Sequence, residues 1–357
     1  MIKCFDSNIT EEDKQNLLTT LQSRVLAFGR NVSEFEHRYA SFSKKKYNIG
    51  LNSASSAAYL LYQYIYEKMG KCRVYTTSLG FVSPVYAAIK NGHDVVYVDV
   101  DNSLLMSTEK LKEAFVNDGT PSIVMPVLYG GVSRIYGMRE FCKENNCTLV
   151  LDSAHCISPT MEYDYAFYSF HPVKPICMSN GGLLATNDDK ASSYMFSGRN
   201  FGRQINGDTY DLVQAGFNFY MNNLNASLGL SQLSRCLDNV QKRKHNFNFV
   251  KNNIPKKLGY FTEHDEGSSY YLSSLVLNNE YSSAIMRQRL KENGVQSSFH
   301  YPYLHKTKFY KQDVNLKKLD SLSDKIINLP IHQELLPGDL EKIVNECICY
   351  CRSWRKP

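Results

Sequence analysis

The sequence has few cysteines, no long uninterrupted apolar run and no long block of charges of one sign. Ten cysteines in 357 residues are far fewer than a disulfide-stabilised scaffold contains. No window holds the roughly 18 consecutive apolar residues that cross a membrane, and no basic start followed by an apolar stretch marks a secretion signal. These absences exclude a disulfide scaffold and predict a cytoplasmic protein with reduced thiols and no membrane partner.

The charge balance also argues against a nucleic-acid-binding protein. The chain has 41 Lys and Arg residues against 35 Asp and Glu residues, a formal net charge of +6. Its basic runs at 44–46 and 242–244 are too short for a basic arm. Cys347, Cys349 and Cys351 alternate in a predicted helix, where such spacing does not direct all three side chains to one ion. We therefore expect no nucleic-acid partner and no metal site.

Strands and helices alternate through the first half of the chain. Segments rich in β-branched and apolar residues predict strands at 46–51, 73–77, 94–99, 122–128, 148–151, 164–169 and 182–186. Helical patterns at 53–69, 81–91 and 135–145 separate several of these strands. The alternation predicts an α/β fold with a mostly parallel seven-stranded sheet flanked by helices.

The pattern changes after about Leu233. We expect a long polar helix at 233–253, a strand at 268–277, a helix at 283–293 and a last helix that ends near residue 350. The chain is therefore predicted to form two domains, a large α/β domain over 1–235 and a smaller α+β domain over 236–357.

Lys174 and Asp152 are the strongest candidates for chemistry. Lys174 follows a predicted strand and lies between two prolines among aromatic and apolar neighbours, so burial would lower its pKa and make its amine a nucleophile. Asp152 ends an apolar strand at the edge where open α/β sheets bind ligands, and a carboxylate there can keep a ring nitrogen protonated. The alternatives are a solvated surface lysine and an aspartate that caps a helix.

Two strand-to-helix connections could hold other parts of a ligand. The small residues at 52–58 open a helix whose free N–H groups favour a phosphate, although a plain Ser-capped helix is the alternative. Phe81 follows the next strand, where an aromatic ring can stack on a planar ligand or belong to the core. His155 could hydrogen-bond a ring oxygen. No G-x-G-x-x-G motif follows the first strand, which argues against a dinucleotide-binding enzyme.

The order of these features along the chain resembles the sugar aminotransferases of the DegT/DnrJ/EryC1/StrS family, which are pyridoxal-phosphate enzymes of fold type I. The resemblance extends from Phe28-Gly29 to Leu329-Pro330. Its most specific stretches are Leu128-Tyr129-Gly130, Asp152 to His155, Ser169 to Lys174, Thr186-Asn187-Asp188 and Gly216 to Asn222.

The resemblance implies roles around the cofactor ring. Lys174 is similar to the lysine that binds pyridoxal 5'-phosphate as a Schiff base. Asp152 is similar to the partner of the ring nitrogen, and His155 stands in the place of a Gln or His near the ring hydroxyl. Phe81 resembles the stacking aromatic.

The resemblance also implies contacts to the cofactor phosphate. Ala54 and Ser55 stand where the family has Gly-Thr, and Ser169 resembles a phosphate-binding serine. Asn218 resembles an asparagine that reaches the phosphate of the neighbouring subunit, which implies a homodimer with shared active sites. Tyr220 departs from the family by replacing a common arginine.

Finally, the resemblance implies a reaction. An amino group passes from glutamate to a nucleotide-linked 4-keto-6-deoxy sugar, for bacterial surface polysaccharides such as O antigen. His300 and Tyr301 resemble substrate contacts, with a packed aromatic turn as the alternative. A 3-keto sugar substrate and a non-catalytic cofactor-binding regulator are the alternative functions. Some relatives with a histidine at the lysine position are dehydratases, and Lys174 argues against that activity.

Overall fold

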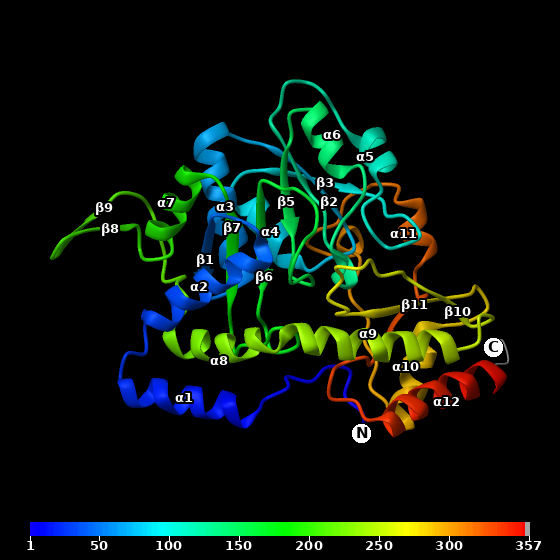
Figure 1. Ribbon diagram of the computed structural model, residues 1–357. Coiled ribbons are helices and arrows are strands. Elements are labelled where there is room, and N and C mark those ends of the chain that lie inside the picture. The colour runs from blue at the N-terminus through cyan, green and yellow to red at the C-terminus, as the bar shows by residue number, and fades with distance from the viewer. Residues whose placement is uncertain (354–357) are drawn as a thin grey trace.

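A seven-stranded sheet forms the centre of the computed structural model, which describes residues 1–353 (Figure 1). Its strands lie in the order β1-β7-β6-β5-β4-β2-β3. Neighbouring strands run parallel, except that β7 is antiparallel to both β1 and β6. The strands are β1 (Tyr47–Leu51), β2 (Arg73–Thr77), β3 (Asp94–Val98), β4 (Ser122–Met125), β5 (Thr148–Asp152), β6 (Tyr165–Ser169) and β7 (Gly182–Thr186). The predicted mostly parallel seven-stranded sheet is confirmed.

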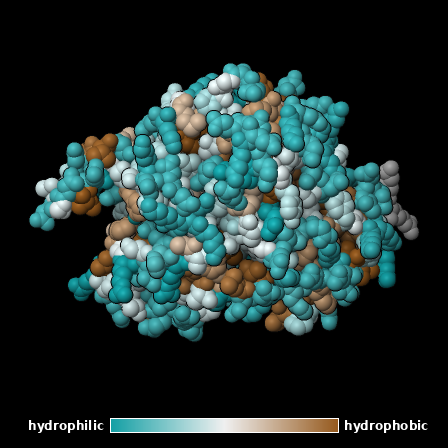
Figure 2. All heavy atoms as spheres, turned by 45° about the horizontal axis from the view of Figure 1, so that its top comes forward, coloured by the Kyte–Doolittle hydropathy of each residue, from teal (hydrophilic) through white to brown (hydrophobic). Residues whose placement is uncertain are grey.

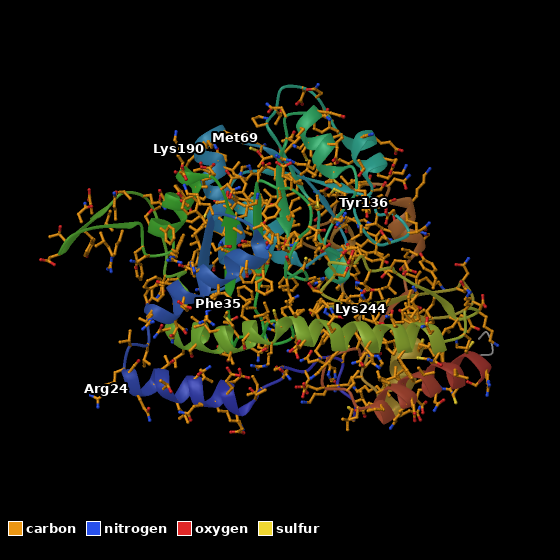
Figure 3. The ribbon with its side chains drawn as sticks, viewed as in Figure 1. Arg24, Phe35, Met69, Tyr136, Lys190 and Lys244 are labelled. Atoms are coloured by element: carbon orange, nitrogen blue, oxygen red, sulfur yellow. The ribbon has the colours of Figure 1, made fainter. Side chains whose placement is uncertain are left out.

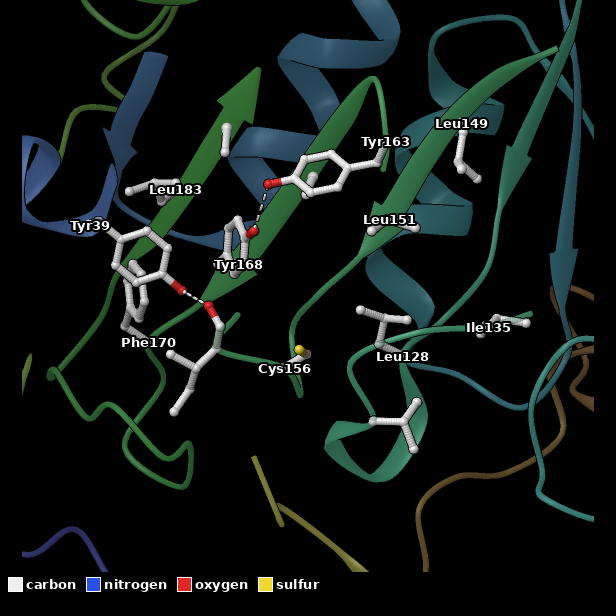
Figure 4. Close-up of a cluster of buried hydrophobic side chains, with 14 of the residues drawn as sticks. Tyr39, Leu128, Ile135, Leu149, Leu151, Cys156, Tyr163, Tyr168, Phe170 and Leu183 are labelled. Atoms are coloured by element: carbon white, nitrogen blue, oxygen red, sulfur yellow. Dashed lines mark hydrogen bonds between the residues drawn. The ribbon is translucent and has the colours of Figure 1, made fainter. Parts of the chain in front are cut away.

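Both faces of the sheet are buried. In β6, Phe167 packs in a cluster with residues of α3, whereas Tyr168 packs in another cluster with Tyr39 of α2. Figure 4 shows the second cluster, in which the Tyr39 hydroxyl donates to the Ile157 carbonyl at 2.9 Å. Helices and short turns around the sheet are α1 (Glu11–Ser23), α2 (Arg30–Ser43), α3 (Ala54–Met69), α4 (Val82–Lys90), α5 (Thr108–Ala114), η1 (Tyr129–Gly131), α6 (Met138–Glu144), α7 (Asp189–Gly198) and α8 (Asn223–Ser234).

The C-terminal part builds a second core on a three-stranded antiparallel sheet in the order β10-β11-β12. The first residues of the chain join this part, since the Ile2 amide donates to the Gly294 carbonyl at 2.8 Å. Lys244, labelled in Figure 3, marks the long helix α9 that runs beneath this sheet. The elements are α9 (Cys236–Asn253), β10 (Gly259–Phe261), β11 (Ser273–Leu277), α10 (Ser283–Glu292), η2 (Leu304–Lys306), α11 (Lys317–Ser321), β12 (Ile326–Leu329) and α12 (Pro337–Ser353).

Several predicted boundaries are wrong, and each has a local cause. The single helix expected at 233–253 is two helices, because Arg235 leaves helical geometry (φ −112°, ψ 7°) and its guanidinium binds Asn8 and Asp13. The helix expected at 135–145 begins only at Met138, because Gly137 has a φ of +71°. The strand expected at 268–277 begins at Ser273, because the preceding residues bond to the turn at Gly130 instead.

Some elements were not predicted at all. They include the N-terminal helices α1 and α2 and a hairpin of β8 (Arg203–Asn206) and β9 (Thr209–Leu212). The hairpin projects from the body at the left of Figure 1. Within residues 1–353, every helix is too short or too polar to span a bilayer. The division of the chain into domains at residue 235 stays a prediction.

Candidate active site at the carboxyl edge of the sheet

The predicted site residues meet where the parallel strands end. Asp152 ends β5 and Ser169 ends β6, while the antiparallel β7 begins at the same edge with Gly182. Gly182 pairs with Leu51 of β1 and with Ser169 of β6. A Cβ atom on Gly182 would lie only 2.1 Å from the Ser53 carbonyl carbon. Only glycine therefore allows the turn before α3 to sit on this edge.

Lys174 is buried, which overturns the alternative of a solvated surface lysine. Only 9% of its surface is exposed. Its loop is closed where the Phe170 amide donates to the Gly181 carbonyl at 2.9 Å. Burial lowers the pKa of Lys174 to about 7, although attraction from Asp152 opposes this effect. The amine is thus largely neutral just above neutral pH, as a nucleophile or a general base requires.

Asp152 is buried at the same edge. The Ala154 amide donates to its Oδ1 at 3.0 Å, and no helix follows, so the side chain is not a helix cap. Burial raises the pKa of Asp152 to about 6, while the Ala154 amide and the charge of Lys174 act in the opposite direction. One amide donor and the charge of Lys174 balance the negative charge of this buried carboxylate only in part. A further cationic group placed beside it would stabilise it. A protonated ring nitrogen fits this requirement.

His155 offers a polar atom without a partner. Its Nε2 lies 2.8 Å from the Tyr301 hydroxyl in a hydrogen bond. Its Nδ1 is buried and has no hydrogen-bond partner among residues 1–353. Burial, followed by the charges of Lys174 and His300, lowers the pKa of His155 well below its usual value. The imidazole is therefore neutral, and one ring nitrogen remains for a ligand.

The first turn of α3 supplies backbone amides next to Gly182 at this edge. Ser53 caps the helix by accepting from the Ser56 amide at 3.1 Å. Ala54 and Ser55 then occupy the first helical positions, where backbone N–H groups lack helical partners. Such a terminus suits a phosphate.

The segment that carries Asn218 lies against this turn. The Asn52 amide nitrogen donates to the Phe219 carbonyl at 2.7 Å, and its side chain donates to the Asn218 carbonyl at 3.1 Å. The Asn218 residue itself is exposed. The structure thus brings its backbone close to the helix start of the same chain.

Phe81 does not belong to the core, because 53% of its surface is exposed. Its ring centroid lies 5.8 Å from that of Tyr301. His300 lies in a packed aromatic turn, with its ring 5.4 Å from Phe5 and its Nδ1 3.0 Å from the Ser298 hydroxyl. Burial, together with the positive charge of Lys174, lowers the pKa of His300 to about 4.

Tyr271 is a residue of the site that was not predicted from the sequence. The Nζ atom of Lys174 lies 4.2 Å from the centroid of the Tyr271 ring, and the His155 ring lies 4.4 Å from it. Tyr271 stands beside Tyr270 in a stretch that predicts a strand. Nothing in that pattern distinguishes the two tyrosines, so no sequence signal could have found it.

The buried amine of Lys174 should cost stability in the cofactor-free protein. Its folded pKa of about 7 lies below the usual value near 10.4, so the cost is absent above about pH 10.4 and grows as the pH falls toward 7. We expect Lys174→Met to raise the free energy of unfolding in urea by up to about 3 kcal/mol at pH 8, and by under about 1 kcal/mol at pH 10. Equal stability of the two proteins at pH 8 would contradict the buried, neutral amine.

Comparisons with known proteins agree with this geometry. The sequence model of the DegT/DnrJ/EryC1/StrS aminotransferase family matches residues 7–347. A UDP-4-amino-4,6-dideoxy-N-acetyl-beta-L-altrosamine transaminase of Campylobacter jejuni (strain 81-176) is 27% identical over 94% of this chain and 93% of its own length. The Helicobacter pylori transaminase of the same name is 27% identical over 96% and 94%.

A solved structure shares the fold. Helicobacter pylori PseC, described as an aminotransferase involved in the biosynthesis of pseudoaminic acid, superimposes with a TM-score of 0.91. The match covers 98% of this chain and 99% of that chain at 24% identity. The α/β fold predicted from the sequence is therefore confirmed over nearly the whole chain.

Proposed function

The chain belongs to the DegT/DnrJ/EryC1/StrS aminotransferase family, and from this premise we propose that it transfers an amino group from glutamate to a nucleotide-linked 4-keto-6-deoxy sugar. The observation that carries the proposal is the buried, largely neutral amine of Lys174 beside the carboxylate of Asp152 at the edge of the sheet. The two relatives named above act at position 4 of a UDP-linked dideoxy sugar by their names. Their activity favours a 4-keto substrate over the 3-keto alternative.

Pyridoxal 5'-phosphate is the cofactor of this transaminase, and the residues present fit it. Lys174 would hold its aldehyde carbon, Asp152 its ring nitrogen and the unpartnered Nδ1 of His155 its ring hydroxyl. Phe81 would cover the ring. The phosphate would lie at the start of α3, in contact with Ala54, Ser55, Ser169 and Asn218. The bound cofactor supplies an electron sink for negative charge on the carbon that carries the amino group.

Residues of this chain move the proton that the amino transfer requires. Because the Lys174 amine is largely neutral just above neutral pH, its Nζ takes a proton from the substrate carbon and gives it to the carbon on the other side of the amino nitrogen. Asp152 keeps its negative charge and holds a proton at the ring nitrogen. The neutral His155 and Tyr301 form a hydrogen-bonded pair that positions the ring oxygen. His300 and Tyr301 would contact the substrate.

Direct assay tests this function. We would incubate the purified protein with glutamate and UDP-linked sugars that carry a ketone at position 4 or at position 3, and identify the products by NMR. The expected product is the 4-amino-4,6-dideoxy sugar, with 2-oxoglutarate released in equal amount. Transfer only to the 3-keto sugar, or no transfer to either, would contradict the proposal.

The projecting hairpin supports a homodimer with shared active sites. Ile205, Tyr210 and Leu212 of this hairpin are exposed, and apolar side chains are visible on the projection in Figure 2. A cavity of about 1070 Å³ lies beside it, lined by residues that include Phe28, Arg199 and Ile205. An isolated two-stranded hairpin is marginal in water, so its apolar side chains need a second surface. A second copy of this chain supplies that surface.

Asn218→Ala should weaken retention of the cofactor by about tenfold, because one hydrogen bond to a charged phosphate is lost. The dissociation constant measured from the visible absorbance on titration with pyridoxal phosphate checks this. Asn252→Ala, at an exposed position of α9 outside the site, is the matched control. Unchanged retention in the Asn218→Ala variant would show that this side chain does not reach the phosphate.

Mixed dimers decide which subunit supplies Asn218. When Asn218→Ala and Lys174→Ala subunits are unfolded and refolded together, a shared site combines Lys174 of one subunit with Asn218 of the other. One site in each mixed dimer is then complete, and its high cofactor affinity returns. If Asn218 serves the site of its own chain, no complete site forms and the affinity stays low.

The proposed product is an amino sugar for a bacterial surface polysaccharide such as O antigen. We place the reaction in the cytoplasm, and the ten cysteines support this assignment because none forms a disulfide.

A further inference from the structure

Tyr271 is a rigid part of the site wall. Its surface is 1% exposed, and its backbone amide donates to the Gly130 carbonyl at 3.0 Å. The neighbouring Leu272 amide donates to the same carbonyl at 3.0 Å. At Gly131, which has a φ of +98°, a Cβ atom would lie 3.0 Å from the Tyr271 nitrogen. These contacts fasten Tyr271 to the turn of η1, in the first half of the chain.

The ring of Tyr271 is the aromatic surface on which the Lys174 amine lies. The Nζ atom is 4.2 Å from the ring centroid, well inside the range of a cation–π contact. Phe5 stacks on the ring at 5.4 Å with an interplanar angle of 22°. Burial raises the pKa of Tyr271, so the ring is a neutral phenol throughout the working pH range.

The other groups around Lys174 offer little support for a positive charge. Asp152 is the one carboxylate that acts on its pKa. His155, His171 and His300 also face it, and burial lowers the pKa of each, so these imidazoles are neutral and add no negative charge. Arg243 acts on the pKa of Tyr271 and, with its own pKa lowered by burial to about 10, is itself cationic.

When the cofactor occupies the site, Asp152 is no longer available to stabilise a positive charge on Lys174. In the proposed function, Asp152 holds the protonated ring nitrogen of the cofactor, so its charge is already neutralised. The π face of Tyr271 is then a protein group that remains in contact with a charged Nζ.

We propose that Tyr271 is a catalytic residue that stabilises the ammonium form of Lys174 while that side chain carries the proton. In the step, the substrate C–H bond would break, its electron pair would pass into the conjugated system that the bound cofactor supplies, and Nζ gains one proton and one positive charge. The ammonium contacts the Tyr271 ring until Nζ gives the proton to the carbon on the other side of the amino nitrogen, where the electron pair forms the new C–H bond, and Nζ becomes neutral again. This inference rests on the proposed function.

The pKa of Lys174 in the full-length, cofactor-free protein tests the inference. Competitive acetylation at a series of pH values, quantified on the peptide that contains Lys174, gives this pKa directly. We expect Tyr271→Leu, which removes the π face, to lower it by about one unit. Tyr271→Phe keeps the ring and should keep the pKa. An unchanged pKa in the Tyr271→Leu variant would overturn the inference.

Controls separate this effect from general damage. Tyr270→Leu removes a neighbouring buried ring that packs on Phe247 and His264, and it should leave the Lys174 pKa unchanged. An equal decrease in that variant would overturn the inference. Should Tyr271→Leu fail to fold, Tyr271→Met fills more of the space and carries the same expectation.

Turnover by the loaded enzyme gives a second readout. We expect Tyr271→Leu to lower kcat by about tenfold with little change in KM, and Tyr271→Phe to retain more of kcat than Tyr271→Leu does. The acetylation experiment needs no sugar substrate. A lowered Lys174 pKa without any sugar amination would therefore refute the proposed function and not the contact, whereas an unchanged pKa with normal amination would refute the role of Tyr271 alone.

Discussion

Lys174→Ala is expected to lower kcat for transamination by at least about 10⁴-fold and to abolish the visible absorbance of the bound cofactor. Lys174 has two roles in the proposed reaction, since its Nζ both holds the cofactor and moves the proton. The methyl group of alanine can do neither. Steady-state assays with glutamate and the keto-sugar, together with spectra after gel filtration, measure both losses.

Lys242→Ala is the matched control for this substitution. Lys242 is an exposed residue of α9 outside the site, so its loss should change neither the spectrum nor the turnover. A Lys174→Ala protein that keeps more than about one per cent of wild-type turnover would mean that another amine carries the proton. Such a result would remove the basis of the proposed function.

Asp152→Asn is expected to lower kcat by about 10³-fold, because a neutral amide of the same shape cannot keep the ring nitrogen protonated. Without that proton the ring is a weaker electron sink. Asp164→Asn is the control: Asp164 binds Arg139 and precedes the first residue of β6, at the opposite end of that strand. A kcat within about tenfold of wild type in the Asp152→Asn protein would contradict the assigned role.

The same substitution should change the pH dependence of cofactor uptake. Burial raises the pKa of Asp152 to about 6 in the cofactor-free protein. Protonation of Lys174 below its pKa of about 7 lowers the affinity for the cofactor in both proteins. Below about pH 6 the wild-type carboxyl is also increasingly protonated and no longer attracts a cationic ring, so the wild-type affinity should fall by a further factor of about ten per pH unit. The Asp152→Asn protein should show a weak affinity without this additional fall. Parallel pH profiles in the two proteins would exclude Asp152 as the titrating group.

The sequence was sufficient to locate the seven strands of the central sheet and most of the residues at their ends. Segments such as 73–77 and 182–186 are recognisable because β-branched and apolar residues alternate with helical patterns over short distances. In a parallel sheet the carboxyl ends share one edge, so Asp152 and Ser169 could be placed together before any coordinates were known. The burial of Lys174 also followed from its local neighbours.

Other features depend on contacts that no local pattern records. The direction of β7, the break at Arg235 and the fastening of the 268–272 segment to Gly130 each depend on partners from distant parts of the chain. The hairpin was missed because its strands are short and exposed and have no apolar face toward a core.

By itself, the sequence determined the α/β architecture and the chemical identity of the proposed pair, an amine and a carboxylate at strand ends, because both follow from short-range patterns and from the shared edge of a parallel sheet. Only the tertiary structure decided what surrounds that pair. Tyr301 hydrogen-bonds His155 across 146 residues of sequence, and the Tyr271 ring contacts the amine of Lys174, a residue distant from it in the sequence. Packing of the chain against itself creates such contacts, so the proton-carrying amine acquires its aromatic neighbour only when the two halves of the chain meet.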